Sequence, residues 1–350
     1  MREDGRILLA SAFVAVLLIA TAALLWDPDS AEKKGETVGI DGFEFERTGE
    51  GTAEMIRFYN EERFDELRIP SSVEIDGTVC IVTSIGVWTL TGYEDIGRIV
   101  IPDTVTSIGA GAFMSSNIGE AVIPSSVKTV GTMAFSGCCA LKKIVFEGNP
   151  EKIAGNAFGY STSLDEVSFG APGRYSAHDG LVLEDDSLFF VTASIGGHLD
   201  IPEVESVGRH AFASAGISTV TIPKTVTRIG EAALVSPNLE EIHVDPDNPV
   251  FASVDGVLFT KDLKTLVAYP AGRTGSYTVP DAVESIAACA FEKCYGLESI
   301  TIGANVQYID EDAFGDIGFY ESEESEEWLE CEDIPGYTYV MKDGRMIRVG

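Results

Sequence analysis

The sequence predicts a solenoid of stacked repeats, mainly β-stranded with short helical or 3-10 turns, preceded by a single N-terminal transmembrane helix. The first observation is that segment 101–113 recurs as near-copies at 123–135, 222–234 and 279–291. A spacing of about 22 residues, with branched apolar residues at fixed phase, is typical of solenoids. The second observation is the uncharged apolar run 7–26. Weaker copies of the repeat begin at Phe146, Phe169, Ile201, Val244 and Ile302.

Each repeat opens with a strand pattern such as Leu141, Ile144 and Phe146, in which the last two apolar residues alternate with an exposed one. A proline then ends the strand, because it has no N–H group for the next ladder bond. A second short β-branched run leads to an Ala-Phe pair such as Ala112 and Phe113, which we expect on a short helical turn with Phe in the core. About nine such units would form a stack roughly 40 Å long.

These residues resemble the BspA-type leucine-rich repeats, also called Treponema-type or type 5 repeats, over roughly residues 64–318. The shared pattern places Leu, Ile, Ile-Pro, Val, Ile-Gly, Ala-Phe, Cys and Leu at fixed positions. Departures are Ala154, Ala287 and Asp310 in place of Gly, and Leu234 in place of Phe. The resemblance implies a surface-displayed or secreted leucine-rich repeat protein that acts in adhesion and protein binding.

Residues 1–26 are interpreted as a signal anchor or a signal peptide. The 20 residues of the run 7–26 are long enough to cross a hydrocarbon core of roughly 30 Å as a helix, so we expect contact with a membrane through this run. Ala20, Thr21 and Ala22 resemble a cleavage site, which leaves secretion after cleavage as the alternative. The flanking charges do not fix the orientation, and the resemblance favours an extracellular solenoid.

The remaining boundaries follow from composition and pattern. We expect a juxtamembrane linker at 27–41, a β-rich N-terminal cap with the first repeat at 42–95, and the solenoid at 96–318. An acidic linker at 319–333 leads to a C-terminal β-hairpin at 334–350, since Asp343-Gly344 is a strong hairpin signal.

Two insertions, 175–198 and 248–276, interrupt the repeats, and segment 179–191 within the first matches segment 255–267 within the second. Each is a strand, a polar turn and a strand, which predicts a β-hairpin. Two interpretations stay open: the hairpins are spacers that cover a sheet edge, or they are protruding binding fingers.

Charge and sparse reactive residues exclude several classes of function. The formal charge of −32, from 56 acidic and 24 basic residues, argues against binding to nucleic acid or anionic lipid. Cys138 and Cys294 share one repeat phase, which favours buried thiols. The histidines show no metal-ligand spacing, and His210 is expected at the surface. We therefore expect no enzyme, no cofactor and no metal.

The class of function that remains is surface recognition. Its candidate site is the set of side chains that face outward between the apolar positions of the strands. Stacking would turn them into a ladder that binds a protein or a surface polymer. The ladder contains no Trp, Tyr or Phe, the residues that dominate binding hot spots. Its members are Arg98, Val100, Glu120, Val122, Lys143, Val145, Glu166, Ser168, Thr219, Thr221, Glu241, His243, Ser299 and Thr301.

The sequence thus predicts a non-enzymatic, cell-surface protein that mediates protein binding or adhesion through the solenoid surface. A structural cell-envelope scaffold, built by contacts between copies, is the first alternative. An enzyme acting on surface polymers is the second, and it would need carboxylates or histidines clustered in a concave pocket.

Overall fold

The structure is a computed structural model that describes residues 36–60, 63–94, 96–315, 317–323, 325, 329–343 and 345–349. The apolar run 7–26 and most of the expected linker lie outside these residues. Within the described ranges, no helix is long and apolar enough to cross a membrane. The described chain is a mainly β solenoid of about 11 turns, against the nine expected, because the cap and the hairpin units also complete turns of the stack.

The first strand of each repeat enters one of three long-strand sheets, in which most neighbouring strands run parallel. Parallel pairing follows from the solenoid path, since every turn brings the chain back in the same direction. The first sheet holds β4 (Phe64–Arg68), β7 (Ile96–Val100), β9 (Ile118–Ile123), β11 (Lys143–Phe146) and β13 (Glu166–Phe169). The second holds β17 (Gly196–Asp200), β19 (Gly216–Ile222) and β21 (Glu241–Val244), and the third holds β25 (Gly275–Thr278), β27 (Leu297–Ile302), β29 (Gly318–Tyr320), β30 (Tyr337–Lys342) and β31 (Arg345–Arg348).

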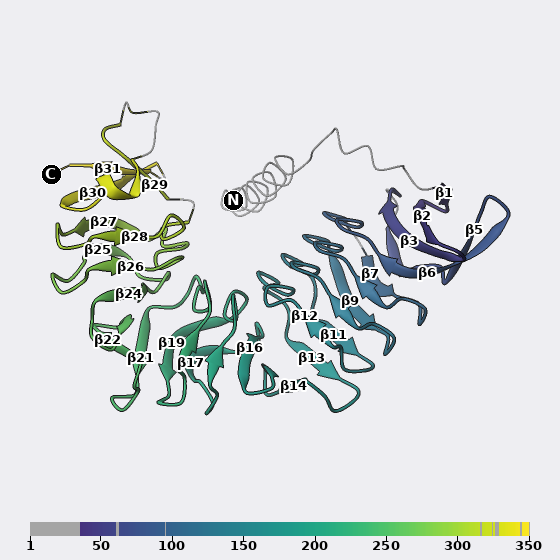
Figure 1. The fold of residues 1–350 in the computed structure, drawn as a ribbon, viewed down its shortest axis with the longest axis horizontal. Helices are drawn as coiled ribbons and strands as arrows, with labels where there is room; N and C mark the ends of the chain where they lie inside the picture. Colours follow the sequence, from purple (N-terminus) through teal and green to yellow (C-terminus); the bar gives the residue numbers. More distant parts are fainter. Residues whose placement is uncertain are drawn as a thin grey trace, which may run out of the picture.

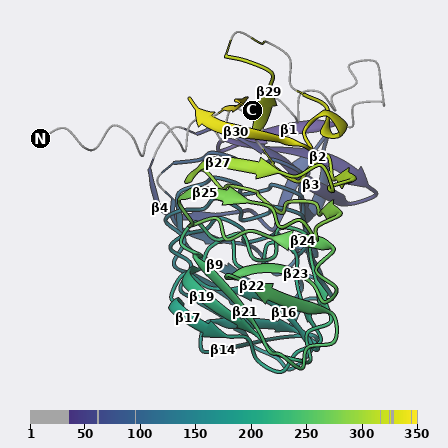
Figure 2. The ribbon, with the colours of Figure 1, turned by 90° about the vertical axis from the view of Figure 1, so that its left-hand side faces the viewer.

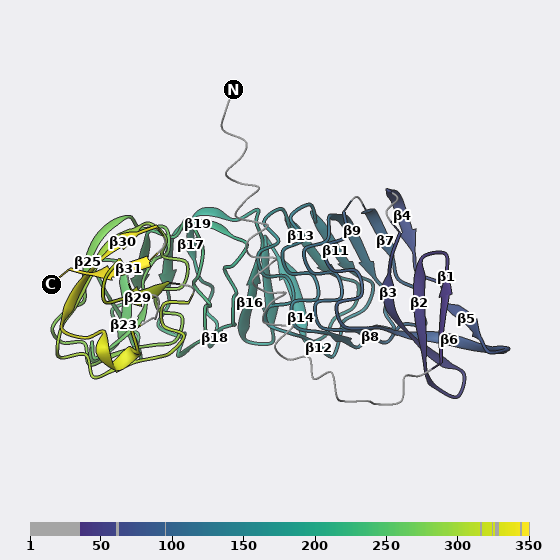
Figure 3. The same ribbon diagram turned by 90° about the horizontal axis from the view of Figure 1, so that it is seen from above.

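The second strand of each repeat enters one of three short-strand sheets, and Figure 3 shows β8 and β12 on the opposite side of the stack from β7, β9, β11 and β13. The first of these sheets joins β1 (Thr37–Ile40), β2 (Phe43–Gly49), β3 (Thr52–Phe58), β5 (Ser72–Ile75) and β6 (Thr78–Ile85) to β8 (Ser107–Ile108), β10 (Thr129–Val130) and β12 (Lys152–Ile153). The second holds β14 (Tyr175–His178), β15 (Leu181–Glu184), β16 (Ser187–Val191), β18 (Ser206–Val207) and β20 (Arg228–Ile229). The third holds β22 (Phe251–Val254), β23 (Val257–Thr260), β24 (Thr265–Ala268), β26 (Ser285–Ile286) and β28 (Tyr308–Ile309).

Both ends of the stack are covered. At one end β1, β2 and β3 pair antiparallel and bury Phe43, Phe45 and Met55 against the first turns. At the other end β30 pairs antiparallel with β27, and β31 with β30. Figure 2 shows β30 lying over β27 and β25. These antiparallel strands supply the cap that the terminal turns of a solenoid need.

The described part of the acidic segment 319–333 packs against the C-terminal hairpin. Glu321 forms an ion pair with Arg348, and Glu323 forms one with Lys342. The guanidinium of Arg345 lies 3.5 Å from the centre of the Tyr320 ring. The basic side chains of β30 and β31 therefore hold the start of the acidic segment. A 3-10 turn at Cys331–Asp333 (η1) follows.

The Ala-Phe pairs lie on tight turns, which corrects the expected helical turns; among the described residues η1 is the only helix. The N–H of Phe113 donates to the carbonyl of Ala134 in the next unit, at 2.8 Å, and the N–H of Phe135 donates to Ala157 in the same way. Ser115 and Met133 have φ of 57° and 55°, in the left-handed region. Alternate amides of each turn thus donate to the next unit, and those between them donate within the turn, as the N–H of Met114 does to Gly111 at 3.0 Å. The left-handed residues stop a right-handed helix from forming.

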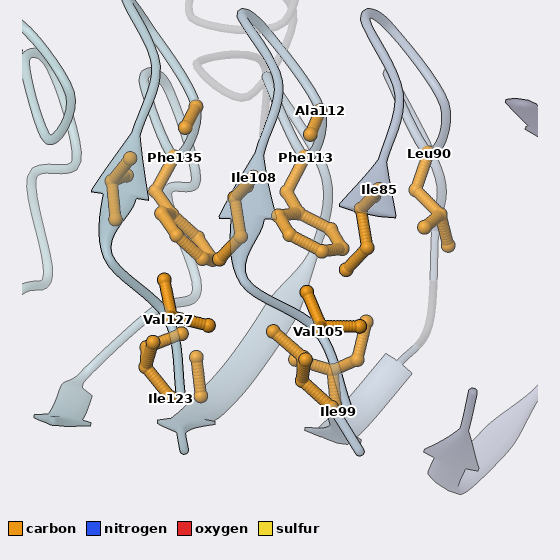
Figure 4. Packing of buried hydrophobic residues seen from close by; sticks show 14 of the residues in the cluster. Ile85, Leu90, Ile99, Val105, Ile108, Ala112, Phe113, Ile123, Val127 and Phe135 are labelled. Carbon is orange, nitrogen blue, oxygen red and sulfur yellow. The ribbon is translucent and has the colours of Figure 1, made fainter. Parts of the chain in front are cut away.

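Buried side chains form columns along the stack (Figure 4). Ile99, Val105 and Ile108 of one unit are at most 2% exposed. The rings of Phe113 and Phe135 stack with centroids 4.9 Å apart. Each unit thus buries its apolar side only against its neighbours, as the repeat pattern predicts.

The two insertions share one topology. In each, a hairpin (β14 with β15, β22 with β23) is followed by a strand (β16, β24) that pairs antiparallel with the hairpin and parallel with the next short strand. The long-strand sheets break at the same places, between β13 and β17 and between β21 and β25. The hydrophobic core is divided there too, into three clusters.

Figure 1 shows that the stack bends into an open arch, with β1–β6 at one end and β25–β31 at the other. The hydroxyl of Tyr160 donates to Glu292, 132 positions along the chain, at 3.3 Å. Several stacked turns separate these residues, and each turn adds roughly 4.8 Å. Their contact therefore places these Ala-Phe turns on the inner side of the arch.

Candidate functional site: the outward ladder

The structure aligns the predicted ladder residues in two rows. In the first long-strand sheet Arg98 pairs with Glu120, Glu120 with Lys143, and Lys143 with Glu166. The second row joins Val100, Val122, Val145 and Ser168 in the same register. All fourteen predicted residues are exposed or half-buried, in alternation with buried ones. The sheet breaks divide them into three groups. We name these the N-terminal ladder (β4 to β13), the central ladder (β17 to β21) and the C-terminal ladder (β25, β27 and β30).

The charged row of the N-terminal ladder alternates in sign, and Glu66 of β4 extends it. Arg98 Nη1 lies 3.6 Å from Glu66 Oε2, and Lys143 Nζ lies 2.6 Å from Glu166 Oε1. Exposed pairs of this kind contribute only about 0–1 kcal/mol to stability. Their effect is on the surface charge: this part of a strongly acidic protein carries alternating, nearly balanced charge.

The valine row lies beside the charged row. Val100, Val122 and Val145 are half-buried, so their outer methyl groups remain accessible. Five strands about 4.8 Å apart make a platform roughly 19 Å wide. An apolar strip bordered by charged groups is the usual anatomy of a protein-binding surface.

The central ladder is a hydrogen-bonded network around His198. His198 Nδ1 lies 2.8 Å from Thr219 Oγ1, and its Nε2 lies 3.0 Å from Asp200 Oδ1. The hydrogen bonds from His198 and from Thr221 hold the pKa of Asp200 below its usual value. His243 Nε2 lies 3.2 Å from Glu241 Oε2 on the next strand.

Hydroxyl, imidazole and carboxylate follow one another here as in a hydrolase triad. The side chains of His198 and Asp200 are 48% and 78% exposed on a sheet face. Catalysis by such a triad needs a water-excluded site with donors for the oxyanion. The open face supplies no such exclusion, and the network presents hydrogen-bond donors and acceptors to solvent.

His198 and Asp200 were absent from the predicted ladder, although β17 carries both. The segment from His198 to Pro202 repeats the pattern of Thr219 to Pro223, with apolar residues at Leu199 and Ile201. That repeated pattern is the sequence signal that identifies His198 and Asp200 as ladder residues. The preceding Gly196 and Gly197, where the register shifts, obscured it.

The C-terminal ladder presents hydroxyl groups. Ser299 Oγ donates to Ser276 Oγ at 2.7 Å, and Thr301 Oγ1 lies 2.9 Å from Thr338 Oγ1. Thr338 belongs to β30, so the C-terminal hairpin extends the ladder beyond the repeats. The three ladders therefore differ in chemistry: charged with valine, imidazole with carboxylate, and hydroxyl.

A second cluster of polar side chains, which the repeat pattern did not predict, lies on the inner side of the arch. Lys293 Nζ lies 3.5 Å from the centre of the Tyr160 ring, and the His210 ring is 6.1 Å from it. Burial raises the pKa of Tyr160, and the nearby Glu292 adds to the effect. We name Tyr160, His210, Glu292 and Lys293 the inner clasp.

His210 is half-buried, which corrects the expectation of a surface residue. Its Nδ1 is buried and has no hydrogen-bond partner among the described residues. Burial lowers its pKa below the usual value. His210 is half-buried because its turn packs directly on the turn of Tyr160, where Ser214 Oγ donates to the carbonyl of Phe158 at 3.3 Å.

The cysteines behave as the repeat phase indicates. Cys138 and Cys294 are fully buried, and burial raises the pKa of Cys138 to about 12. The Cys138 thiol donates to the carbonyl of Phe113 at 3.0 Å. All six cysteines fall within the described ranges, and no disulfide joins any two of them there. In those ranges no three His, Cys, Asp or Glu residues converge as metal ligands.

Solved structures with similar folds come from bacterial leucine-rich repeat proteins. One is a leucine rich cell surface protein from Faecalibacterium prausnitzii, with 24% identity, a TM-score of 0.44, and coverage of 81% of this chain and 73% of that chain. The pneumococcal vaccine antigen PcpA has 18% identity and a TM-score of 0.36, over 79% and 67%. A leucine-rich repeat protein from Eubacterium ventriosum has 19% identity and a TM-score of 0.34, over 81% and 65%.

No curated protein matches the chain. The sequence model of the BspA type Leucine rich repeat region matches it in six copies, over residues 54–174, 187–260 and 269–335. The gaps between these ranges fall in the two inserted hairpins. Since the match covers well over half of the sequence and confirms the resemblance, the chain belongs to the BspA-type leucine-rich repeat family.

Proposed function

We propose that the chain is a non-enzymatic, surface-displayed protein that binds a protein or a surface polymer through the outward ladder. The observation that carries the proposal is the N-terminal ladder, where Val100, Val122 and Val145 form an apolar strip beside a row of alternating charges. The parallel sheet holds both rows on a rigid backbone. Affinity would then come from many modest contacts made with little loss of conformational entropy.

The test compares two surfaces of the full chain. Arg98→Glu combined with Lys143→Glu reverses both positive charges of the N-terminal ladder. Arg228→Glu combined with Lys264→Glu is the matched control, because these are also an exposed arginine and an exposed lysine in ion pairs, each 2.8 Å from a glutamate, but they lie on or directly beside short strands (β20 and β24). Binding to immobilised matrix proteins and surface polysaccharides is measured by interferometry. We expect the ladder variant to lose about tenfold in affinity and the control to bind as the wild type does.

Equal binding by the ladder variant and the wild type would contradict the ladder as the binding surface. Sedimentation of the same samples tests the alternative function. Assembly of the chain with itself that increases with concentration, without binding to any foreign partner, would replace the proposal by a cell-envelope scaffold.

We also propose that the run 7–26 anchors the chain in a membrane, with the solenoid outside the cell. The support is the length of the apolar run, which matches a hydrocarbon core, together with the family. Protease added to intact cells would then remove the solenoid and leave the anchor. Full protection of the solenoid would contradict this topology, and release of the chain into the medium would indicate cleavage after Ala22.

A further inference from the structure

A cavity of about 150 Å³ lies at the second inserted hairpin. Its walls are the Ala-Phe turn of one unit (229–235), the end of β24 with the next residue (267–269), and the following turn (287–289). Ala287, Ala288 and Cys289 are half-buried, so the cavity opens to solvent beside them. Cys289 lies near Tyr160 of the inner clasp, which places the opening on the inner side of the arch.

The first inserted hairpin explains how the cavity arises. Leu188 of β16 pairs with Val207, and Leu266 of β24 pairs with Ile286, so the two strands occupy equivalent positions. The N–H groups of Val191 and Tyr269 both donate to the alanine of the next Ala-Phe turn, at 2.8 and 2.7 Å. By this alignment, residues 189 and 190 correspond to residues 267 and 268.

Two aromatic rings fill the space beside the first hairpin, and smaller side chains occupy the equivalent positions at the second. Phe158 of the preceding turn meets Phe190, with ring centroids 5.7 Å apart. The equivalent pair at the second hairpin is Leu234 and Ala268, and both residues line the cavity. The space that two rings fill in one place is left open in the other.

The cavity has the size and the walls of a site for an aromatic ring. An enclosed apolar cavity of about 150 Å³ admits benzene. This pocket has the same volume but opens to solvent, and Leu234, Val235 and Val267 lie among its apolar lining residues. Tyr269 is one of the lining residues, and its ring stacks on Phe291, with centroids 5.2 Å apart. A ring inserted from the inner side would complete the aromatic column at the point where it is interrupted.

The rim of the cavity is acidic. Glu231, Glu292 and Asp312 all lie close enough to the Cys289 thiol to help burial raise its pKa to about 12. Glu231 is also a lining residue, and its side chain is half exposed.

Three cations nearby are already engaged. Arg273, whose guanidinium lies 5.9 Å from the centre of the Tyr269 ring, donates to the carbonyls of Glu240 and Asp255. Arg209 forms an ion pair with Glu231 at 2.8 Å, and Lys293 lies over the ring of Tyr160. With a formal charge of −32 on the whole chain, the surroundings attract a positive segment.

We propose that this cavity receives an aromatic side chain of a protein segment whose flanking residues are basic. The inference rests on the proposed function, because it gives a binding protein one defined pocket and one class of partner. The pocket and the outward ladder belong to different faces of the solenoid, so each can fail without the other.

The test uses the full chain and three short peptides, Ac-Lys-Phe-Lys-NH2, Ac-Lys-Ala-Lys-NH2 and Ac-Glu-Phe-Glu-NH2, with binding measured by calorimetry. We expect the first peptide to bind at least about tenfold more tightly than the second, since a buried phenyl ring contributes that much. We expect the third to bind more weakly than the first, with the difference decreasing at high salt.

The variant Ala268→Phe places a ring where Phe190 has one at the first hairpin. We expect it to keep the fold, to unfold at a temperature no lower than the wild type, and to lose binding of Ac-Lys-Phe-Lys-NH2. Leu234→Phe restores the family residue on the other wall and is the second variant, should the first not fold. The ladder variant Arg98→Glu with Lys143→Glu should bind this peptide as the wild type does.

Equal binding of the Phe and Ala peptides, or full binding by a folded Ala268→Phe protein, would overturn the proposal. If the wild type self-associates and Ala268→Phe abolishes this, the occupant is a second copy of the chain and the foreign partner is excluded. Loss of polymer binding in the ladder variant, with peptide binding intact, would separate the pocket from the proposed function of the ladder.

Discussion

The two junctions at which a hairpin enters the stack have one topology and two different interiors. At the first junction Phe189 and Phe190 of β16 pack against Phe158, and Phe189 also meets Tyr175. At the second junction Val267 and Ala268 of β24 line a cavity. The pairing of the strands is therefore sufficient to fix the position of each hairpin in the stack. The side chains on its inner side are then free to fill the space or to leave a pocket.

Both hairpins separate core clusters, as the burial of β23 shows. Val257 and Phe259 belong to the C-terminal cluster, and Leu258 between them belongs to the middle cluster. Successive side chains of a strand point to opposite faces, so one strand can close two cores at once. Of the two interpretations of the insertions, this burial favours spacers that cover a sheet edge.

The largest effect that tests the comparison is expected from Phe190→Ala. The substitution removes a ring that is 1% exposed and makes the first junction resemble the second. We expect the free energy of unfolding, measured by urea titration, to fall by about 3–5 kcal/mol.

Val267→Ala at the second junction is the control for that loss; Val267 is the equivalent of Phe189, the neighbour of Phe190. Val267 is half-buried and borders a space that is already open, so its truncation should cost about 1 kcal/mol or less. Equal losses for the two variants would mean that the first junction is no better packed than the second.

A smaller difference is expected from the asparagines that tie each hairpin to the preceding turn. Asn248 is fully buried and donates to the carbonyls of Pro223 and Val226 at 2.8 and 2.9 Å, while its Oδ1 accepts from Val250 and Phe251. We expect Asn248→Ala to lower the free energy of unfolding by about 3 kcal/mol, because four backbone groups lose a buried partner.

Asn149 plays the equivalent role at the first junction, but it precedes the hairpin in the chain. Its Nδ2 donates to the carbonyl of Tyr175, and its Oδ1 accepts from the N–H of Tyr175. It is half-buried, so water can replace part of what its amide provides. Thermal and urea unfolding of Asn149→Ala should show a loss of about 1–2 kcal/mol. A loss as large as that of Asn248→Ala would show that burial does not distinguish the two amides.

The repeat pattern predicted the features that depend on contacts between neighbouring turns. The strand pattern, the proline after it, the buried Phe113 and Phe135, and the buried Cys138 all follow from contacts between adjacent units, which recur with every copy. The expected helical turns were wrong, because alternate amides of these turns bond to the next unit and left-handed residues interrupt them, which a single repeat does not reveal.

The repeat pattern could not predict the contacts across the arch. Tyr160 meets Glu292 only because the stack bends, and the bend is the sum of many small rotations between turns. The cavity could be predicted from the sequence only in part. The match of segment 179–191 with 255–267 aligns Val191 with Val267, whereas the strand pairing shifts β24 by two residues and aligns Phe189 and Phe190 with Val267 and Ala268. The loss of the two rings is therefore visible only once β16 and β24 are known to occupy equivalent positions.

The smallest predicted effect concerns His210 of the inner clasp. Burial lowers its pKa, with Arg209 and Lys293 acting in the same direction and Glu292 and Glu231 opposing them. The unfolded chain then binds more protons at this site than the folded chain does as the pH falls below about 6.5. The contribution of His210 to stability is therefore complete above that pH and decreases as the pH falls toward the lowered pKa of the folded state.

We expect His210→Asn to remove this part of the pH dependence, measured as the free energy of unfolding in urea between neutral and mildly acidic pH. Asn suits the position, because His210 has a φ of 54° and Asn tolerates the left-handed region better than most residues. His178→Asn at the tip of the first hairpin is the control, since that side chain is 89% exposed. If both variants kept the slope of the wild type, the inner clasp would not be the origin of the acid sensitivity, and the stability of the arch would be independent of the protonation of His210.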